Sequence, residues 1–583
     1  MIHTLAKSLR TYKKGSVITI LLSVLEAAFE ILIPLCMAKV IDDGIEVGSM
    51  GAVWKYGIIL LAFAFIQLVT GVLAAHIAAR TSVGFSANLR QDMYDNVQTF
   101  SFSNIDKFST ASIVTRLTTD VTNIQNAYQM LIRMAIRGPV MLIFSMIVSF
   151  RINRTISYIF LAVIPVMAVL FLLIIKRVNP IFNRVFRTYD TLNNVVQENI
   201  RGIRVVKSFN REEYEIGKFK GISENIYREF AKGERLLAFN SPIMQFFMYA
   251  CMLLISWIGA KAIVASGNNA ALGLTTGDLT ALFSYATQIL MSLMMLSMVF
   301  AMIIISLASA RRITEVLEEK TDIANPANAI TSVQDGSICF HDVDFVYASK
   351  ADKKVLDHIH LSISSGETVG IIGGTGSSKS SLVQLIPRLY DVTGGSLTLG
   401  GVDVRHYDLE TLRNAVAMVL QKNELFSGTI KENLRWGNEN ATDEELEQAC
   451  KLACADEFIQ TFPDKYDTYI EQGGTNVSGG QKQRLCIARA LLKKPKVLIL
   501  DDSTSAVDTK TDACIQNSFT DYIPNTTKII IAQRVSSVQH ADQIVVLDEG
   551  KIVASGKHQE LLACCDIYRE VYESQQKGEH EDA

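Results

Sequence analysis

The sequence predicts an all-α transmembrane domain followed by an α/β nucleotide-binding domain with a helical subdomain. A chain of 583 residues has room for two large domains, and its 49% hydrophobic content exceeds soluble norms. The apolar excess is uneven, because long apolar runs fill roughly the first 310 residues, whereas strand-like and helix-like runs alternate after Ser337. The third observation is a glycine-rich loop at Gly373–Ser380, which lies between an apolar strand and a helical run.

Six apolar stretches are long enough to cross a bilayer, which takes about 20 residues of helix. The third and fourth are separated only by Arg151-Ile152-Asn153-Arg154, which predicts a tight hairpin. Ahead of all six stretches, the first fifteen residues carry Lys and Arg around apolar side chains, and we expect them to lie at the membrane surface. The expected spans cover residues 17–40, 56–78, 134–150, 156–175, 242–265 and 279–308.

Loop charge predicts the orientation of these spans. The segments Arg80–Arg137 and Lys176–Arg235 are long and rich in Lys and Arg, whereas the first loop, 42–46, is acidic. Both termini and the two long segments are therefore expected in the cytoplasm, in a multi-pass protein of the plasma membrane. Arg151 and Arg154 violate the charge bias in one outer loop, where two charges are outweighed by the rest.

The two long basic segments also show helical spacing with few breakers, so they are expected to continue the membrane helices into the cytoplasm. Each should turn at a short connector, at Asp106–Ser112 and at Phe209–Glu213. These segments are either ordinary exposed helices or helices that couple the spans to a nucleotide-binding domain.

Glu26 and Glu30 lie one helical turn apart on the first span, where charged side chains are costly and need a reason. They face either a water-filled cavity or partner helix, or they contribute to a site for a cationic substrate. A methionine-rich stripe on the last span suits adaptable binding surfaces, although such a stripe is more often plain packing.

The expected domain boundaries are 1–319 for the membrane domain, 320–336 for the linker, 337–575 for the nucleotide-binding domain and 576–583 for a tail. The net charge is −3 and we see no basic patch, so nucleic acid is not an expected partner. The nine cysteines show no paired metal-ligand spacing, which argues against a zinc site.

The glycine-rich loop has the order expected of a phosphate-binding loop: strand, glycine-rich turn, Lys-Ser, helix. Its backbone N–H groups and the helix start would face the anion, Lys379 would reach the terminal phosphates, and the Ser380 hydroxyl would reach Mg²⁺. The usual pattern has glycine before the lysine, and here that residue is Ser378. The expected nucleotide contacts are Gly373, Gly374, Thr375, Gly376, Ser377, Ser378, Lys379, Ser380 and Ser381.

Two further motifs follow the loop. The apolar run 497–500 ends in Asp501, an arrangement that holds Mg²⁺ beside a bound triphosphate. Ahead of it, Val477-Ser478-Gly479-Gly480-Gln481-Lys482-Gln483-Arg484 places glycines at a helix start and makes a second anion-binding end. Two such helix starts in one domain suggest composite sites, in which one subunit's second motif closes over another subunit's first.

With these motifs, the region from about Ser337 to Leu562 resembles the ATPase domain of ABC transporters, and six spans plus this domain resemble a type IV ABC exporter half-transporter. The resemblance implies that Tyr347 stacks on adenine and that Gln421 ligates Mg²⁺ together with Ser380 and Asp501. It also implies that Glu471 lies where exporters contact coupling helices, and that residues 505–508 link the two sites. Ser478, Gly479, Gly480 and Gln481 should contact nucleotide held by a partner subunit.

Two more residues depart from the family pattern, both at catalytic positions. The glutamate that follows the metal-binding aspartate is Asp502, whose oxygen falls about 1.5 Å short, and a misplacement of about 1 Å can cost roughly a hundredfold. The switch histidine is Gln533, which can hydrogen-bond to a phosphate but cannot become a cation. With Ser378, three departures fall in the residues that perform hydrolysis, while the signature at 478–481 is intact.

This pattern resembles one subunit of the heterodimeric bacterial multidrug-type exporters, the one with the degenerate ATP site. The resemblance implies a second half-transporter as partner, ATP and Mg²⁺ as ligands, and efflux of small amphipathic substrates across the bilayer. Export of lipid or peptide is the alternative substrate class. A regulatory, essentially non-catalytic half that gates its partner is the alternative from another functional class.

Overall fold

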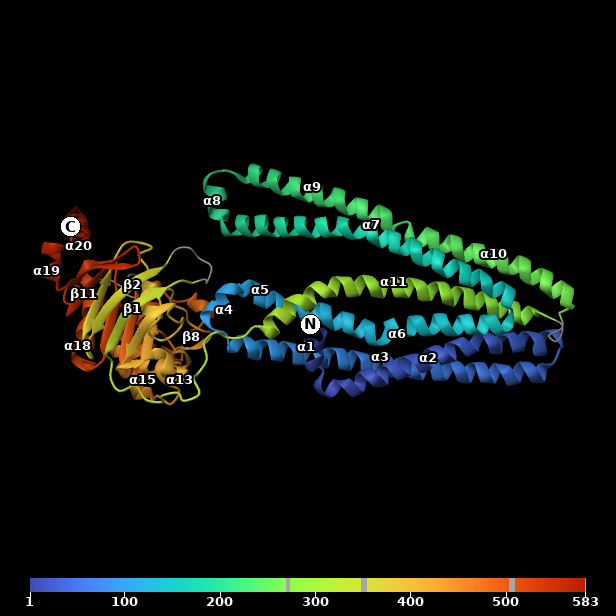
Figure 1. Ribbon diagram of the computed structural model, residues 1–583, viewed down its shortest axis with the longest axis horizontal. Helices are drawn as coiled ribbons and strands as arrows, with labels where there is room; N and C mark the ends of the chain where they lie inside the picture. The colour runs from blue at the N-terminus through green and yellow to red at the C-terminus, as the bar shows by residue number, and fades with distance from the viewer. Residues whose placement is uncertain (269–272, 348–353, 503–508, 582–583) are drawn as a thin grey trace. The chain divides into compact units, whose positions relative to one another are not determined.

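The computed structural model describes residues 1–268, 273–347, 354–502 and 509–581. The chain forms two compact units (Figure 1). The membrane unit comprises 1–98 and 109–319. The second unit comprises 99–108 and 320–583, and we call it the ATP-binding unit after the motifs predicted above. The short segment 99–108 therefore belongs with the second unit, although the sequence predicted one unbroken membrane domain over 1–319.

Among the residues that the structure describes, the membrane unit contains six helices long and apolar enough to span a bilayer, which confirms the predicted all-α class. Several run well past the apolar stretches, as the sequence predicted, since α3 continues to Gln98 and α7 to Arg201. The helices that carry the spans are α2 Lys13–Lys39, α3 Met50–Gln98, α6 Val121–Ile152, α7 Arg154–Arg201, α10 Asn240–Ser266 and α11 Thr276–Glu318.

Shorter helices complete the membrane unit. Inside it, α2 packs along α3, α6 packs along α11, and α7 packs along α9, as Figure 1 shows. Apolar clusters join α2, α6 and α11 around Ala27, Met141 and Tyr285. The shorter elements are α1 Ile2–Lys7, α5 Thr110–Thr115, α8 Ile203–Ser208 and α9 Glu212–Leu237, with π-helical turns at Val40–Glu46 and Arg116–Asp120.

The ATP-binding unit is built on a six-stranded sheet in the order β12-β11-β3-β10-β9-β6, parallel except for β12. The central strands β9 and β10 are buried along their whole length and mostly apolar, as expected where both faces of a parallel sheet are covered. These strands are β3 Thr368–Ile372, β6 Val416–Val419, β9 Val497–Asp501, β10 Thr527–Ile531, β11 Gln543–Asp548 and β12 Lys551–Gly556.

A second, antiparallel sheet in the order β2-β1-β4-β5 packs beside it, and the sequence did not predict this sheet. A two-stranded ribbon pairs β7 with β8. The strands are β1 Ile338–Phe345, β2 Leu356–Ile363, β4 Gly394–Leu399, β5 Val402–Asp403, β7 Gly428–Thr429 and β8 Tyr469–Ile470.

Helices of the ATP-binding unit supply its site and its helical subdomain. The last of them runs through the region that the sequence predicted to be a tail after residue 575. They are α4 Phe102–Lys107, α12 Lys379–Gln384, α13 Leu409–Ala415, α14 Ile430–Arg435, α15 Asp443–Leu452, α16 Asp456–Ile459, α17 Gly479–Leu492, α18 Thr509–Tyr522, α19 His558–Cys564 and α20 Asp566–Glu581.

Candidate functional site: a phosphate-binding loop with altered catalytic positions

The glycine-rich loop connects β3 to α12, as predicted, and its lysine lies back over the loop. Lys379 Nζ donates hydrogen bonds to the carbonyl oxygens of Gly373 at 2.7 Å and Gly374 at 2.9 Å, and to Ser377 Oγ at 3.2 Å. Burial lowers the pKa of Lys379, and the nearby carboxylates oppose that effect. The amine is thus fixed by weak neutral acceptors, which leaves its charge available to an anion.

Ser378 occupies a backbone conformation that favours glycine. Its φ is +71° and its ψ is +23°, in the left-handed region, immediately before α12. A side chain in this region costs roughly 1–2 kcal/mol. Ser378 therefore replaces the usual glycine at a position whose backbone conformation still favours glycine.

The predicted magnesium ligands lie together beside the loop. Ser380 Oγ donates to Asp501 Oδ1 at 3.0 Å, and Gln421 lines the same cavity. Burial raises the pKa of Asp501, against the opposing effects of the Ser380 hydrogen bond and the Lys379 charge. A hydroxyl, a carboxylate and an amide oxygen are the hard donors that Mg²⁺ prefers, so this set fits the ion.

Asp502 and Gln533, the two altered catalytic residues, contact each other. Gln533 Nε2 donates to Asp502 Oδ2 at 2.7 Å, and Gln421 Nε2 lies 3.4 Å from the same oxygen. The Asp502 backbone is also left-handed, with φ +49°. The carboxylate is thus held by two amides beside the predicted magnesium ligands.

Gln575 on α20 supports the segment that carries Gln533, and sequence reasoning missed it. Its amide nitrogen donates to the Gln533 carbonyl oxygen at 2.7 Å, and its Oε1 accepts from the Val535 N–H at 2.9 Å. A lone glutamine at the border of the expected tail gave no signal of this role.

The cavity around these groups has a volume of about 960 Å³. Tyr347 lies at its edge, 44% exposed, and its hydroxyl lies 2.8 Å from Ser381 Oγ. The ring packs edge-on against Tyr390 with centroids 5.1 Å apart. The cavity is lined by Tyr347, Lys354, Val355, residues 373–381, Gln421, Asp501, Asp502, Ile531, Gln533, Asp548 and Glu549.

The signature residues form the start of α17, outside that lining. Ser478 caps the helix: its Oγ accepts from the Gln481 N–H at 3.3 Å, and Gln481 Oε1 accepts from the Ser478 N–H at 2.9 Å. Gly479 is exposed and Gly480 is half-buried. The helix start is therefore ordered and accessible. Residues 505–508, expected to link two sites, lie outside the described residues.

The first predicted connector forms α4 at 102–107, which begins earlier than the expected turn at 106–112. Asp106 Oδ2 accepts from the Tyr390 hydroxyl at 2.7 Å, and Asn104 Nδ2 donates to the Lys320 carbonyl oxygen at 3.1 Å. Since Tyr390 also contacts Tyr347, α4 reaches the neighbour of the residue predicted to stack on adenine. Glu471, predicted near a coupling helix, is exposed and accepts from Thr475 Oγ1 at 2.8 Å.

In the membrane unit, Arg137 of α6 lies between Glu26 and Glu30 of α2. Its Nη1 is 3.1 Å from Glu26 Oε1, and its Nη2 is 2.5 Å from Glu30 Oε2. The two carboxylates thus have a partner helix, which is the simpler of the two explanations that the sequence allowed.

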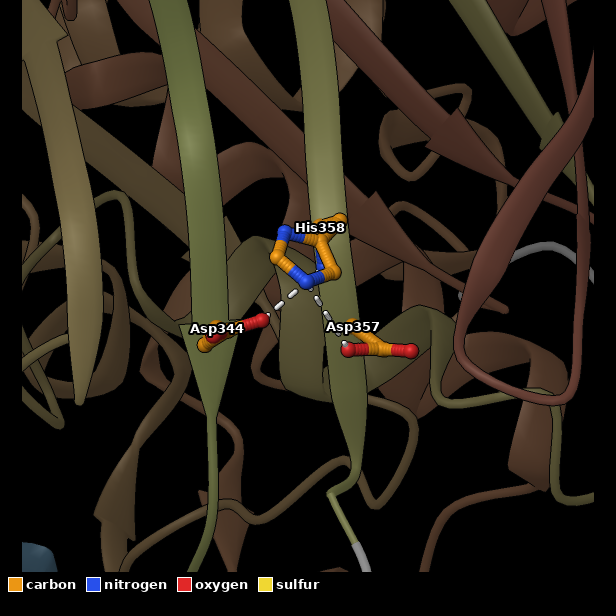
Figure 2. Close-up of side chains that lie close together, drawn as sticks. All are labelled: Asp344, Asp357 and His358. Atoms are coloured by element: carbon orange, nitrogen blue, oxygen red, sulfur yellow. Dashed lines mark hydrogen bonds and ion pairs between the residues drawn. The ribbon is translucent and has the colours of Figure 1, made fainter.

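Asp344, Asp357 and His358 also lie close together, on β1 and β2 (Figure 2). Lys354 Nζ lies 2.8 Å from a carboxylate oxygen of each aspartate, and Lys551 pairs with Asp357 at 3.0 Å. Ammonium groups already neutralise these carboxylates, so we assign no metal to this group.

A strand–loop–helix phosphate site, a buried acidic strand end and a second capped helix start define an ATP-binding unit attached to a helical membrane unit. Two family models agree: the ABC transporter transmembrane region matches residues 16–293, and the ABC transporter domain matches 356–505. The chain therefore belongs to the ABC transporter family.

Relatives and a solved structure support the same assignment. The chain is 36% identical over 567 residues to the uncharacterised ABC transporter ATP-binding protein YfiB of Bacillus subtilis, covering 97% of each chain. It is 33% identical to the ATP-dependent lipid A-core flippase of Desulfotalea psychrophila, covering 89% of each. A bacterial Atm1-family ABC exporter with ATP bound shares the fold, with a TM-score of 0.83 at 24% identity, covering 97% of this chain and 99% of that one.

Proposed function

We propose that this chain is one half of a heterodimeric ABC exporter. Its own phosphate loop holds ATP with slow hydrolysis, and its α17 start completes a competent ATP site on the partner. The observation that carries this proposal is the pair of altered catalytic positions, Asp502 and Gln533, which bind each other at 2.7 Å.

The chemistry of that pair explains slow hydrolysis. Attack on the γ-phosphate needs a water molecule that is oriented and deprotonated, and the product is ADP with inorganic phosphate. Asp502 is shorter than the usual glutamate, and its Oδ2 is also occupied by the Gln533 amide. Gln533 cannot supply a positive charge. Nucleotide binding depends instead on Lys379, Ser380 and Asp501, which keep the residue types of the family pattern, and Mg²⁺ held there would neutralise phosphate charge.

A partner half-transporter is supported by an exposed apolar surface on the arm α7–α8–α9. No described residue of α8 is buried, and large apolar side chains line the end of the arm. Monomers rarely leave such contiguous apolar surface uncovered. The exposed residues include Ile200 (66%), Val205 (60%), Phe209 (72%), Tyr214 (66%) and Ile216 (64%).

In this mechanism, ATP binding at both composite sites closes the two ATP-binding units. Coupling helices transmit closure to the spans, and the Asp106–Tyr390 hydrogen bond supports this role for α4. Hydrolysis at the partner-based site then resets the transporter. The loop-charge bias orients both termini toward the cytoplasm of a bacterial cell, with export across the plasma membrane.

The proposed substrates are drugs or other small amphipathic molecules. Exposed methionines on α11, including Met291 (54%), Met294 (41%) and Met298 (63%), offer an adaptable surface for them. Lipid export is the second candidate, and the flippase relative favours it.

Expression of this chain alone and together with a companion half-transporter tests the proposal. Alone, the chain should bind ATP with Mg²⁺ but hydrolyse it at a small fraction of the rate of the mixed assembly. Vigorous ATP hydrolysis by the chain alone as a homodimer would contradict the proposal. Transport by the mixed assembly that does not depend on the companion's catalytic glutamate would favour an inverted division of roles.

A further inference from the structure

The turn between α6 and α7 carries the two arginines that the loop-charge rule does not explain. Arg151 lies in the last turn of α6, and Arg154 is the first residue of α7. Asn153 alone separates the helices, and its side chain caps α7 by accepting from the Ile156 N–H at 3.1 Å. Both guanidinium groups are therefore held on a short, ordered turn.

Below this turn, α6 presents an apolar groove. The cavity has a volume of about 520 Å³. Ile143 and Ile147, one helical turn apart, are 55% and 49% exposed. The lining is Leu142, Ile143, Met146, Ile147, Phe150, Arg151 and Arg154, so one end is cationic and the rest is hydrocarbon.

Neither arginine is neutralised by its surroundings. Across the described ranges, the side chains of Arg151 and Arg154 have no hydrogen bond or ion pair, whereas Arg137 of α6 binds two carboxylates. An arginine fork prefers bidentate contact with a carboxylate or phosphate. The groove therefore offers two free forks to an anion.

Nearby aromatic residues indicate the depth of this turn. Phe150 and Tyr158 pack edge-on with ring centroids 5.7 Å apart, and Tyr158 is 60% exposed. Tyrosines with one wet and one apolar end gather at the level of lipid headgroups. The arginines should consequently lie among phosphates, with the groove descending into the acyl-chain region.

We propose that this groove binds one anionic phospholipid, with its phosphate between Arg151 and Arg154 and an acyl chain along Ile143 and Ile147. A phospholipid combines an anion and a hydrocarbon chain, and both parts have a matching surface here. Acidic phospholipids neutralise the pair more fully than zwitterionic ones, because they carry no compensating ammonium. On the proposed orientation, this lipid lies in the outer leaflet.

Native mass spectrometry of the full chain tests this site. The protein is extracted into mild detergent and titrated with phosphatidylglycerol or phosphatidylcholine. We expect Arg151→Gln/Arg154→Gln to weaken phosphatidylglycerol binding about tenfold and to leave phosphatidylcholine binding unchanged. Orientation does not affect this measurement, and ATP hydrolysis is not its readout, so it can fail independently of the proposed function.

Lys55→Gln/Lys261→Gln is the matched control. The two exposed lysines lie on α3 and α10, where they pack over aromatic rings outside the groove. Their replacement also removes two positive charges from the membrane unit. This variant should retain phosphatidylglycerol. If both double variants lost phosphatidylglycerol binding equally, general electrostatic attraction would explain the loss, and the proposal would be overturned.

A third variant tests the groove itself. Ile147→Trp keeps both arginines and fills the apolar half of the groove, so it should also weaken phosphatidylglycerol binding. In the parent protein, inorganic phosphate alone should compete negligibly with phosphatidylglycerol. Undiminished lipid binding in Ile147→Trp would overturn the acyl-chain part. A change of oligomeric state in Arg151→Gln/Arg154→Gln, measured by light scattering, would show that a partner subunit covers the groove, and would overturn the lipid assignment.

Discussion

The ATP-binding unit contains two helix starts that can hold phosphate, and they are built differently. At α12 the residue before the helix is Ser378, with a left-handed backbone and no side-chain cap. At α17 it is Ser478, which has an extended backbone and a reciprocal capping box with Gln481. The same residue type thus strains one helix start and stabilises the other.

This difference matches the two roles that we propose for the chain. The α12 side carries every departure from the family pattern, because Asp502 and Gln533 lie in the same cavity as the loop. The α17 side retains its sequence and an ordered, exposed start. A chain selected for hydrolysis at its own site would be expected to show the reverse distribution of changes.

The largest expected effect comes from disrupting α17 in the exporter assembled with its partner. Ser478→Arg places a long cationic side chain at the helix start, and ATP turnover should fall at least about a hundredfold, because the competent site loses the groups that contact the γ-phosphate. Steady-state phosphate release measures this. Thr442→Ala is the control, since it removes an equivalent capping box on α15 at a similar cost of about 1 kcal/mol. Unaltered turnover in Ser478→Arg would break the comparison.

Restoring the catalytic residues should produce the next largest change. Asp502→Glu with Gln533→His returns the longer carboxylate and a titratable ring, and should raise single-site hydrolysis by up to about a hundredfold. Single-turnover assays on the chain without its partner measure the gain. Adding Asp501→Asn should abolish it by removing the carboxylate predicted to hold Mg²⁺. If the double variant hydrolysed ATP as slowly as the parent, Asp502 and Gln533 would not be the cause of slow hydrolysis.

Motifs fix the spacing of the predicted site residues along the chain, so sequence reasoning could select them without a structure. In the structure Ser380 and Asp501 lie in hydrogen-bond contact, since the loop and the strand end meet at one edge of a parallel sheet. Their roles toward nucleotide and Mg²⁺ stay predictions. Sequence reasoning could not pair Arg137 with Glu26 and Glu30, because helix packing brings together residues more than 100 positions apart. Periodicity predicts which residues share a face, but it does not identify the facing helix.

The boundaries were predicted less well, for related reasons. The helix of the first connector begins at Phe102, ahead of the predicted turn, because Ser101 forms a capping box with Asn104 that the turn prediction overlooked. The predicted tail after residue 575 continues as α20, and Gln575 hydrogen-bonds to the Gln533 segment. A polar, exposed sequence is compatible with a free chain end and with an exposed helix face. Tertiary contacts decide which of the two forms.

Lys379 tests how strongly the altered side still binds nucleotide. Lys379→Ala should weaken ATP binding to this chain about 10- to 100-fold, since charge-assisted hydrogen bonds contribute roughly 1.5–3 kcal/mol. Titration with a fluorescent ATP analogue measures the affinity. Lys482→Ala is the matched control, because that lysine also donates to a loop carbonyl oxygen, of Gly473 at 2.7 Å, but lies outside the cavity. If both variants lost ATP affinity equally, the start of α12 could not be distinguished from that of α17 as the site at which this chain binds ATP.

Ser378→Gly is expected to have the smallest effect, and it sharpens the comparison most directly. Glycine relieves the left-handed strain of roughly 1–2 kcal/mol, and greater freedom in the unfolded chain offsets about 0.4–1 kcal/mol of that gain. Removing the Cβ also lets the loop backbone approach phosphate, so ATP affinity should rise about two- to fivefold, as measured by the same titration. Lys465→Gly relieves comparable strain at φ +46°, outside the cavity, and should leave affinity unchanged. Unchanged affinity in Ser378→Gly would make the serine incidental, and the weakness of this site would then rest on Asp502 and Gln533 alone.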